Sequence, residues 1–162
     1  MKKYIGRLIK IKFKDMGPLV GHLLDYSDEW ILMRNCPVDY VVDGYFIVRN
    51  KNIKTVVRRE DEKWREKVIG LKKLKAAPKI PLIDLNAILK ALTKKYQVFS
   101  IHTKEDDVCW LGRLNRIEDK LVIIDDLTPK AKWDGQFKFK ENEIRVLEFD
   151  SDYVNSLKVL AK

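Results

Sequence analysis

The chain has 162 residues, of which 46% are hydrophobic and 35% charged, and its formal net charge is +9. This is globular composition, enough for one domain or two small ones, and it excludes a disordered or fibrous chain. No apolar run approaches the roughly 20 residues that a membrane-spanning helix needs. The basic N-terminus has no signal-peptide pattern, so we expect a soluble protein of a bacterial-type cytoplasm, with Cys36 and Cys109 as reduced thiols.

Two stretches of the sequence repeat each other at a distance of 91 positions. The string DGYFIVRNKNIKTV at residues 43–56 corresponds to DGQFKFKENEIRVL at residues 134–147. Alignment of Gly21 with Gly112 keeps the two copies in register over about forty residues without a gap. The same alternation and the same turn residues occur in both copies, which indicates an internal duplication with the period of a domain.

Each copy is expected to form five short strands. In the first copy they lie around residues 9–13, 19–24, 30–33, 45–48 and 53–57, and in the second around 98–101, 110–114, 121–124, 136–139 and 144–149. A glycine inside the second strand favours a sharp bend, and Asp-Gly before the fourth is turn chemistry. Short bent strands with tight turns are typical of a small closed barrel. We therefore predict a mostly-β protein of two tandem five-stranded small barrels, of the Sm-like or SH3-like kind, at residues 1–57 and 84–162.

Residues 58–83 are predicted to connect the barrels through a basic helical and extended segment. The stretch EDEKWREKVI at residues 60–69 begins with acidic residues and ends at Gly70, which predicts a helix. One side of this helix carries Trp64, Val68 and Leu71. The lysine- and proline-containing residues 71–81 are expected to be extended.

Two further helices are expected in the second barrel unit. Asp84 is a natural N-cap for a helix that runs to about Lys95, with apolar residues at helical spacing. The tail at residues 151–160 has the same spacing and predicts a closing helix.

The net charge is concentrated in the middle of the chain. Residues 58–95 contain 12 basic and 5 acidic residues, whereas residues 96–162 contain 11 and 13. A polyanion, RNA before other nucleic acids, is therefore expected to bind the connector, where cations would contact phosphates and an exposed aromatic would stack on a base. The candidate residues are Arg58, Arg59, Lys63, Arg65, Lys67, Lys72, Lys73, Lys75 and Lys79, with Trp64 among them.

The connector also has a simpler interpretation. Glu60, Glu62 and Glu66 would pair locally with lysines on a solvated helix face. Trp64 would then pack on a barrel, and its position in the apolar stripe of the helix favours packing.

The strand pattern is similar to that of the Sm-like family of small barrels, in which a helix precedes the first strand, as residues 84–95 would do for the second copy. The string IVRNKNI at residues 47–53 resembles the second Sm motif, which has an Arg-Gly pair at this turn. The resemblance implies that Arg49 takes the arginine position and contacts nucleic acid, with Lys140 as its equivalent. Asn50 would replace the glycine, since asparagine also tolerates a left-handed turn.

The resemblance does not extend to the whole base pocket of uridine-binding Sm proteins. Those proteins carry an Asp and an Asn between strands two and three, where this chain has Ser27 and Ile31 in the first copy and Glu118 and Val122 in the second. The strings EDDVCWLGRL and PKAKWDG of the second copy are also similar to a widespread bacterial family with a tandem arrangement and no known activity.

A protein-interaction module is the competing hypothesis. Trp110 and Trp133 flank the second copy, where they would either plug the barrel core or line a cleft for a protein or ligand. The binding surface would then be this cleft or the edge strand of a barrel. The two barrels are also expected to pack together as an intramolecular pseudo-dimer.

The sequence does not support catalysis, a metal site or a cofactor. His22, His102 and the two cysteines lack the paired spacing of zinc ligands, and no glycine-rich phosphate loop is present. A nucleophile pair of Cys109 and His102 would need an orienting group that is not visible. Asp106–Asp107 and Asp125–Asp126 are neighbours whose side chains would point to opposite faces of a strand. We therefore expect a non-catalytic binding module.

Overall fold

The computed structural model describes residues 1–104 and 108–161. Its strands are β1 (Leu8–Phe13), β2 (Leu19–Tyr26), β3 (Trp30–Asn35), β4 (Tyr45–Arg49), β5 (Ile53–Val57), β6 (Phe99–His102), β7 (Cys109–Glu118), β8 (Leu121–Leu127), β9 (Trp133–Lys140) and β10 (Val146–Phe149). Its helices are α1 (Glu60–Gly70), α2 (Leu85–Tyr96) and α3 (Asp152–Leu160), with short 3-10 helices η1 (Lys2–Tyr4) and η2 (Glu141–Glu143). The prediction of a mostly-β chain is confirmed.

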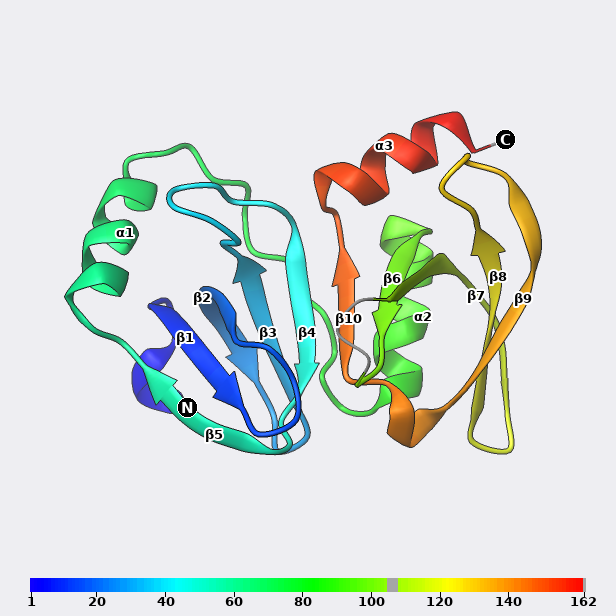
Figure 1. Ribbon diagram of the computed structural model, residues 1–162, viewed down its shortest axis with the longest axis horizontal. Helices are drawn as coiled ribbons and strands as arrows, with labels where there is room; N and C mark the ends of the chain where they lie inside the picture. The colour runs from blue at the N-terminus through cyan, green and yellow to red at the C-terminus, as the bar shows by residue number, and fades with distance from the viewer. Residues whose placement is uncertain (105–107, 162) are drawn as a thin grey trace.

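All of these strands belong to one antiparallel sheet with the order β5-β1-β2-β3-β4-β10-β6-β7-β8-β9. The strands β1–β5 form one half of the molecule and β6–β10 the other (Figure 1). Within the described residues the sheet has free edges at β5 and β9 and is not closed. The pairing therefore forms one continuous sheet where the sequence predicts two separate, closed barrels.

The backbone geometry of one half recurs in the other. A Cβ atom on Gly21 would lie 2.2 Å from the carbonyl oxygen of Arg34, and one on Gly112 would lie 2.1 Å from that of Asp125, 91 positions further along. The pairing of the second and third strands is also irregular at corresponding places, between Leu23 and Asp25 and between Leu114 and Arg116. Each half thus bends its second strand where glycine lets another backbone approach.

The two halves are joined along a seam, by which we mean the β4–β10 pair and the side chains that cross it. The residues opposite one another are Val48 and Val146, Ile47 and Leu147, Phe46 and Glu148, and Tyr45 and Phe149. The amide of Arg49 extends the ladder by donating to the carbonyl of Arg145 at 2.9 Å. The seam therefore pairs the fourth strand of the first half with the fifth strand of the second.

The helix α2 covers one face of the seam. The carboxylate of Asp84, the predicted N-cap of α2, accepts a 2.7 Å hydrogen bond from the amide of Ala87. The predicted N-cap is therefore confirmed. The apolar side of α2 packs with residues from both halves, namely Trp30, Leu32, Tyr45, Ile47, Phe99, Leu147 and Phe149. Since this cluster draws on both halves, the largest core of the molecule lies between them.

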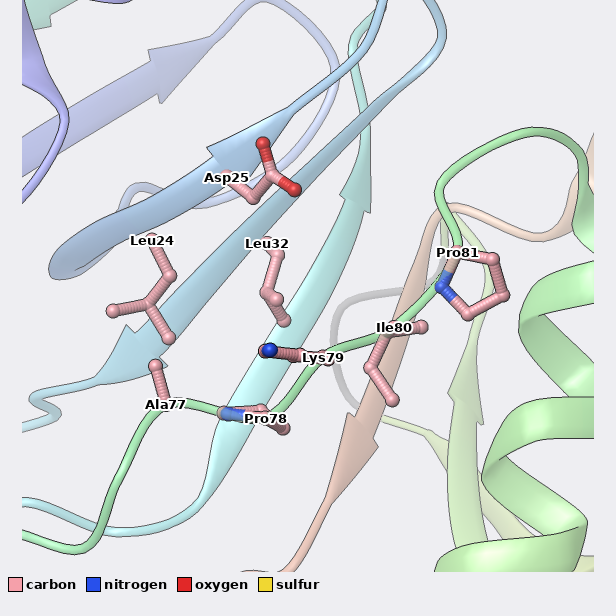
Figure 2. A pocket seen from close by; sticks show the side chains of 8 residues that line it. All are labelled: Leu24, Asp25, Leu32, Ala77, Pro78, Lys79, Ile80 and Pro81. Carbon is pink, nitrogen blue, oxygen red and sulfur yellow. The ribbon is translucent and has the colours of Figure 1, made fainter.

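The segment before α2 also lies against the sheet. Figure 2 shows residues 77–81 running beside Leu24 and Leu32. Ile80 and Leu82 are buried in the same cluster as α2, and a hollow of about 530 Å³ remains between this segment and the strands. The connector thus belongs to the core at its C-terminal end.

Helices α1 and α3 each follow the fifth strand of their half, at an offset close to 91 positions. Ile69 of α1 packs with Leu8 and Cys36 at the outer face of the first half. Val154 and Leu157 of α3 pack on the second half in the same way, which confirms the predicted closing helix.

The close approach at Gly112 predicts a large effect of a single methyl group. Gly112→Ala should lower the free energy of unfolding by about 3 kcal/mol, because the new Cβ would overlap the Asp125 carbonyl, which is backbone and cannot swing away. The matched control is Gly70→Ala, where nothing lies within 4 Å of the added atom and no change or a slight stabilisation is expected. Urea unfolding of both variants measures this, and equal stabilities would contradict it.

Candidate nucleic-acid interface

A partly buried carboxylate fixes α1 to the first half of the sheet. Glu66 accepts a 2.7 Å hydrogen bond from the amide of Leu8 and pairs with Arg58 at 3.1 Å and Arg7 at 3.2 Å. Burial by itself would raise the pKa of Glu66, but these hydrogen bonds outweigh it and hold the pKa below its ordinary value. The inward side of α1 is therefore partly polar, and Ile69 is its main apolar contact.

Two cations of the connector hold the loop between β3 and β4 against α1. The guanidinium of Arg65 donates to the carbonyls of Asp39 at 2.5 Å and Cys36 at 3.1 Å. The ammonium of Lys72 donates to the carbonyl of Tyr40 at 2.6 Å. Arg65 and Lys72 thus position this loop.

Trp64 lies on the outward side of α1. Its side chain is 57% exposed, its indole Nε1 donates to the hydroxyl of Tyr40 at 3.2 Å, and the ammonium of Lys67 lies 5.7 Å from its ring centre. The expectation that Trp64 packs on a barrel is therefore wrong. Tyr40 is itself 38% exposed, so two aromatic side chains stand together at the surface.

We use the term α1 surface for this aromatic pair and the cations beside it on α1. Among the described residues, Arg59 and Lys67 have no carboxylate within ion-pair distance. Lys63 pairs with Glu60 at 2.5 Å on the exposed side of the helix, a contact that water weakens. The α1 surface comprises Tyr40, Arg59, Lys63, Trp64 and Lys67.

The other predicted cations of the connector lie elsewhere. Lys72, Lys73 and Lys75 line a hollow of about 390 Å³ together with Asp43, Asp150 and Asp152. Lys75 lies 3.6 Å from the Asp150 carboxylate. The structure therefore divides the predicted basic stretch into an α1 part and a part beside acidic residues.

Arg49 lies in the seam. Its guanidinium donates to the carbonyls of Glu141 at 2.8 Å and Ile144 at 3.1 Å, pairs with Glu29, and stacks 4.4 Å from the Trp30 ring centre. These partners come from both halves of the chain, so Arg49 holds the halves together. A contact between Arg49 and nucleic acid stays a prediction.

Trp110 and Trp133 are not brought together into one cleft. Trp110 packs edge-on against Phe139, with ring centres 5.2 Å apart, inside the second half. Trp133 packs with the α3 cluster, and the Arg113 guanidinium lies 4.4 Å over its ring. Each tryptophan therefore belongs to a different hollow.

The two thiols are poorly suited to nucleophilic chemistry. Burial raises the pKa of Cys36 to about 11, although its sulfur lies 3.6 Å from Nδ1 of His22. Burial, and then the nearby Glu148, raises the pKa of Cys109, which stands opposite His102 across β6 and β7. Both effects favour the unreactive thiol over the thiolate.

Two kinds of feature are absent from the described part of the chain. No group of three His, Cys, Asp or Glu side chains that could hold a metal ion is found there. No helix there is long and apolar enough to cross a membrane. Asp106 and Asp107 lie outside the described residues.

Comparison of the chain with family models, curated proteins and solved structures finds no match. The resemblance to Sm-like barrels therefore stays an expectation.

The sequence pattern did not indicate Tyr40 as part of this surface. The loop PVDYVVD at residues 37–43 looks like an ordinary connection between strands. Its position depends on side-chain bonds from Arg65 and Lys72, which are distant in sequence. The one signal that could have identified Tyr40 is that its loop exposes a tyrosine and two valines.

The anchoring of α1 predicts a pH-dependent loss of stability. Glu66→Gln should lower the free energy of unfolding by about 2 kcal/mol at neutral pH, because a charge-assisted bond is lost. Folding lowers the pKa of Glu66, so the extra stability of the wild type over Glu66→Gln is fully present above pH 4.5, the ordinary pKa of a glutamate. This extra stability is lost as the pH falls through the folded-state pKa.

Urea unfolding at neutral and acidic pH measures this difference. Glu60→Gln is the matched control, because Glu60 is exposed and its partner Lys63 is held only at the surface. A stability difference between wild type and Glu66→Gln that does not shrink in acid would contradict the assignment.

Proposed function

We propose that the chain is a non-catalytic binding module that holds single-stranded nucleic acid, RNA in the first place, on the α1 surface. The observation that carries the proposal is the exposure of Trp64 beside Tyr40 and under the Lys67 ammonium. Full burial of a large apolar side chain is worth about 1.5–3 kcal/mol, and a partly exposed pair of aromatic side chains leaves part of this gain to a ligand.

The chemistry of the α1 surface fits a flexible polyanion. Nucleic-acid bases stack on exposed aromatic rings whatever their sequence, and cations nearby neutralise the phosphates. Lys67 supplies that charge beside the Trp64 ring, and Lys63 on the same helix and Arg59 at its N-cap add to it. Arg65 and Lys72 act as positioning residues, because they hold the loop that carries Tyr40.

We also propose that each half is a small barrel of the Sm-like or SH3-like kind. The first strand of each half pairs with the fifth as well as the second, as a small barrel requires. The matched glycines and matched irregularities of the second strand support the same bend in both halves. In this reading the seam joins two barrels into an intramolecular pseudo-dimer, and a cytoplasmic location is part of the proposal.

Binding of a fluorescein-labelled mixed-sequence single-stranded RNA, followed by anisotropy at several salt concentrations, tests the function. Trp64→Ala should weaken binding about tenfold or more, because one stacked base is lost. Neutralising Arg59 and Lys67 together should lower the slope of log affinity against log salt by about two. Duplex DNA should bind more weakly, since its bases are not free to stack.

Tyr153→Ala is the matched control. Tyr153 is 51% exposed on α3, the helix that corresponds to α1 in the second half, but it stands beside Asp150 and Asp152. Its loss should leave binding unchanged. Absence of binding at low salt, or equal losses from Trp64→Ala and Tyr153→Ala, would overturn the proposal.

A further inference from the structure

The outer edge of β9 is the unpaired counterpart of the β4 edge that forms the seam. β4 and β9 are the fourth strands of the two halves, and β4 is paired on both sides whereas β9 pairs only with β8 among the described residues. The internal repeat therefore shows, within one molecule, how a strand adds to this edge. In the described part of the second half, no strand takes that position.

The backbone at the outer edge of β9 has room for a neighbouring strand. A Cβ atom on Gly44 would collide with the end of β10, 2.6 Å from the carbonyl of Phe149, whereas one on Gly135 would meet nothing within 4 Å. The two glycines correspond, and both have positive φ angles, +65° and +76°. No described residue occupies, at Gly135 of β9, the space that the end of β10 fills at Gly44.

The amides of β9 are oriented toward that space. In the seam the amide of Arg49 donates to β10, and every second residue of an antiparallel strand faces the same neighbour. The corresponding amides of β9 are those of Lys138 and Lys140. The Lys140 amide already donates to a carboxylate, the Oε2 atom of Glu143, at 3.1 Å.

An aromatic hollow adjoins the edge. This β9 hollow has a volume of about 680 Å³, and Trp110, Phe137 and Phe139 line it, with Phe137 41% exposed. The corresponding hollow of the first half, at Leu19 and Phe46, has only about 260 Å³ and is partly closed by Val146 and Glu148 of β10. The second half therefore exposes rings that a neighbouring strand would cover.

The charges at the β9 hollow indicate what kind of strand fits. Among the residues that the structure describes, four lysines and one glutamate line it, namely Lys51, Lys104, Lys138, Lys140 and Glu143. The fifth strand of a second copy of this chain would bring Lys54 and Arg58 to this edge, and like charges would oppose it. An acidic strand is favoured instead.

We propose that β9 is a docking edge for an acidic extended segment of a partner protein, which adds to the sheet as a further antiparallel strand. Its small apolar side chains lie over Phe137 and Phe139, and its carboxylates lie opposite Lys138 and Lys140. Main-chain hydrogen bonds supply affinity and the alternating side chains supply specificity, as in other strand-addition complexes. This site is separate from the α1 surface and does not depend on the nucleic-acid proposal.

The register of the β4–β10 pair determines the sequence of a peptide that tests this proposal. If the partner strand lies on β9 as β10 lies on β4, acidic positions face Lys140 and Lys138 and apolar positions face Phe139 and Phe137. A fluorescein-labelled synthetic peptide of alternating glutamate and valine meets this pattern. A peptide of the same composition with a central proline cannot complete the ladder and is the matched control.

Anisotropy titrations with the full-length chain measure peptide binding. The glutamate–valine peptide should bind at micromolar concentration, and the proline-containing peptide at least tenfold more weakly. Lys138→Glu combined with Lys140→Glu should abolish that binding and create binding of a lysine–valine peptide. Both side chains are exposed, so the charge-reversed chain should fold normally.

Two additional readouts locate the strand. Phe137→Ser should weaken binding, whereas Glu143→Ala should strengthen it, because a like charge leaves and the Lys140 amide becomes free. Hydrogen exchange should show protection of the Lys138 amide when the peptide is bound.

Other occupants give distinguishable results. Absence of peptide binding at low salt, equal binding of the proline-containing peptide, or no protection at Lys138 would overturn the proposal. Concentration-dependent self-association in sedimentation that Lys138→Glu with Lys140→Glu removes would assign the edge to a second copy of the chain. Displacement of the peptide by single-stranded RNA in a chain carrying Trp64→Ala would assign it to nucleic acid.

Discussion

The antiparallel pairing of β4 with β10 is the interaction on which the rest of the molecule depends. It turns ten strands into one sheet, and it places the largest apolar cluster between the halves, where α2 covers it. Arg49 reinforces the pairing from the side, because its donors reach carbonyls that lie more than ninety residues away. A cation that a sequence motif would assign to a ligand is thereby used to hold the protein together.

The two proposed binding surfaces follow from what each half does not bury. In the first half, α1 is held by a carboxylate and by Ile69, so Trp64 is left over and faces solvent. In the second half, α3 packs through Val154 and Leu157, and the outer edge of β9, which pairs only with β8 among the described residues, is the exposed feature. The same order of strands thus exposes the α1 surface in the first half and the outer edge of β9 in the second.

Local features of the fold were predictable from the sequence, and distant ones were not. Asp84 marks the start of α2 through a side-chain bond three residues along, and this is read correctly from the sequence. α1 also ends at the predicted place, although Gly70 is itself its last helical residue. Gly21 and Gly112 reveal the repeat because the bend they permit needs glycine in both copies. These signals depend on chemistry that neighbouring residues supply.

Spacing alone misassigns Trp64, because it assumes that apolar side chains hold a helix in place. Here the anchor is Glu66, whose main partner, the Leu8 amide, lies 58 positions away and leaves no periodic trace. Trp110 and Trp133 are separated because they lie on different strands, β7 and β9, and join different clusters. Position along the chain does not show which cluster a residue joins.

The continuous sheet has a consequence for how the protein loses its structure. The two halves share part of their core, because Trp30, Leu32 and Ile47 of the first half are buried in one cluster with residues of α2 and β10. Melting of one half would expose these side chains and remove the neighbour that satisfies the β4 backbone. The halves should therefore unfold in a single cooperative transition, in contrast to domains on a flexible linker, which unfold independently.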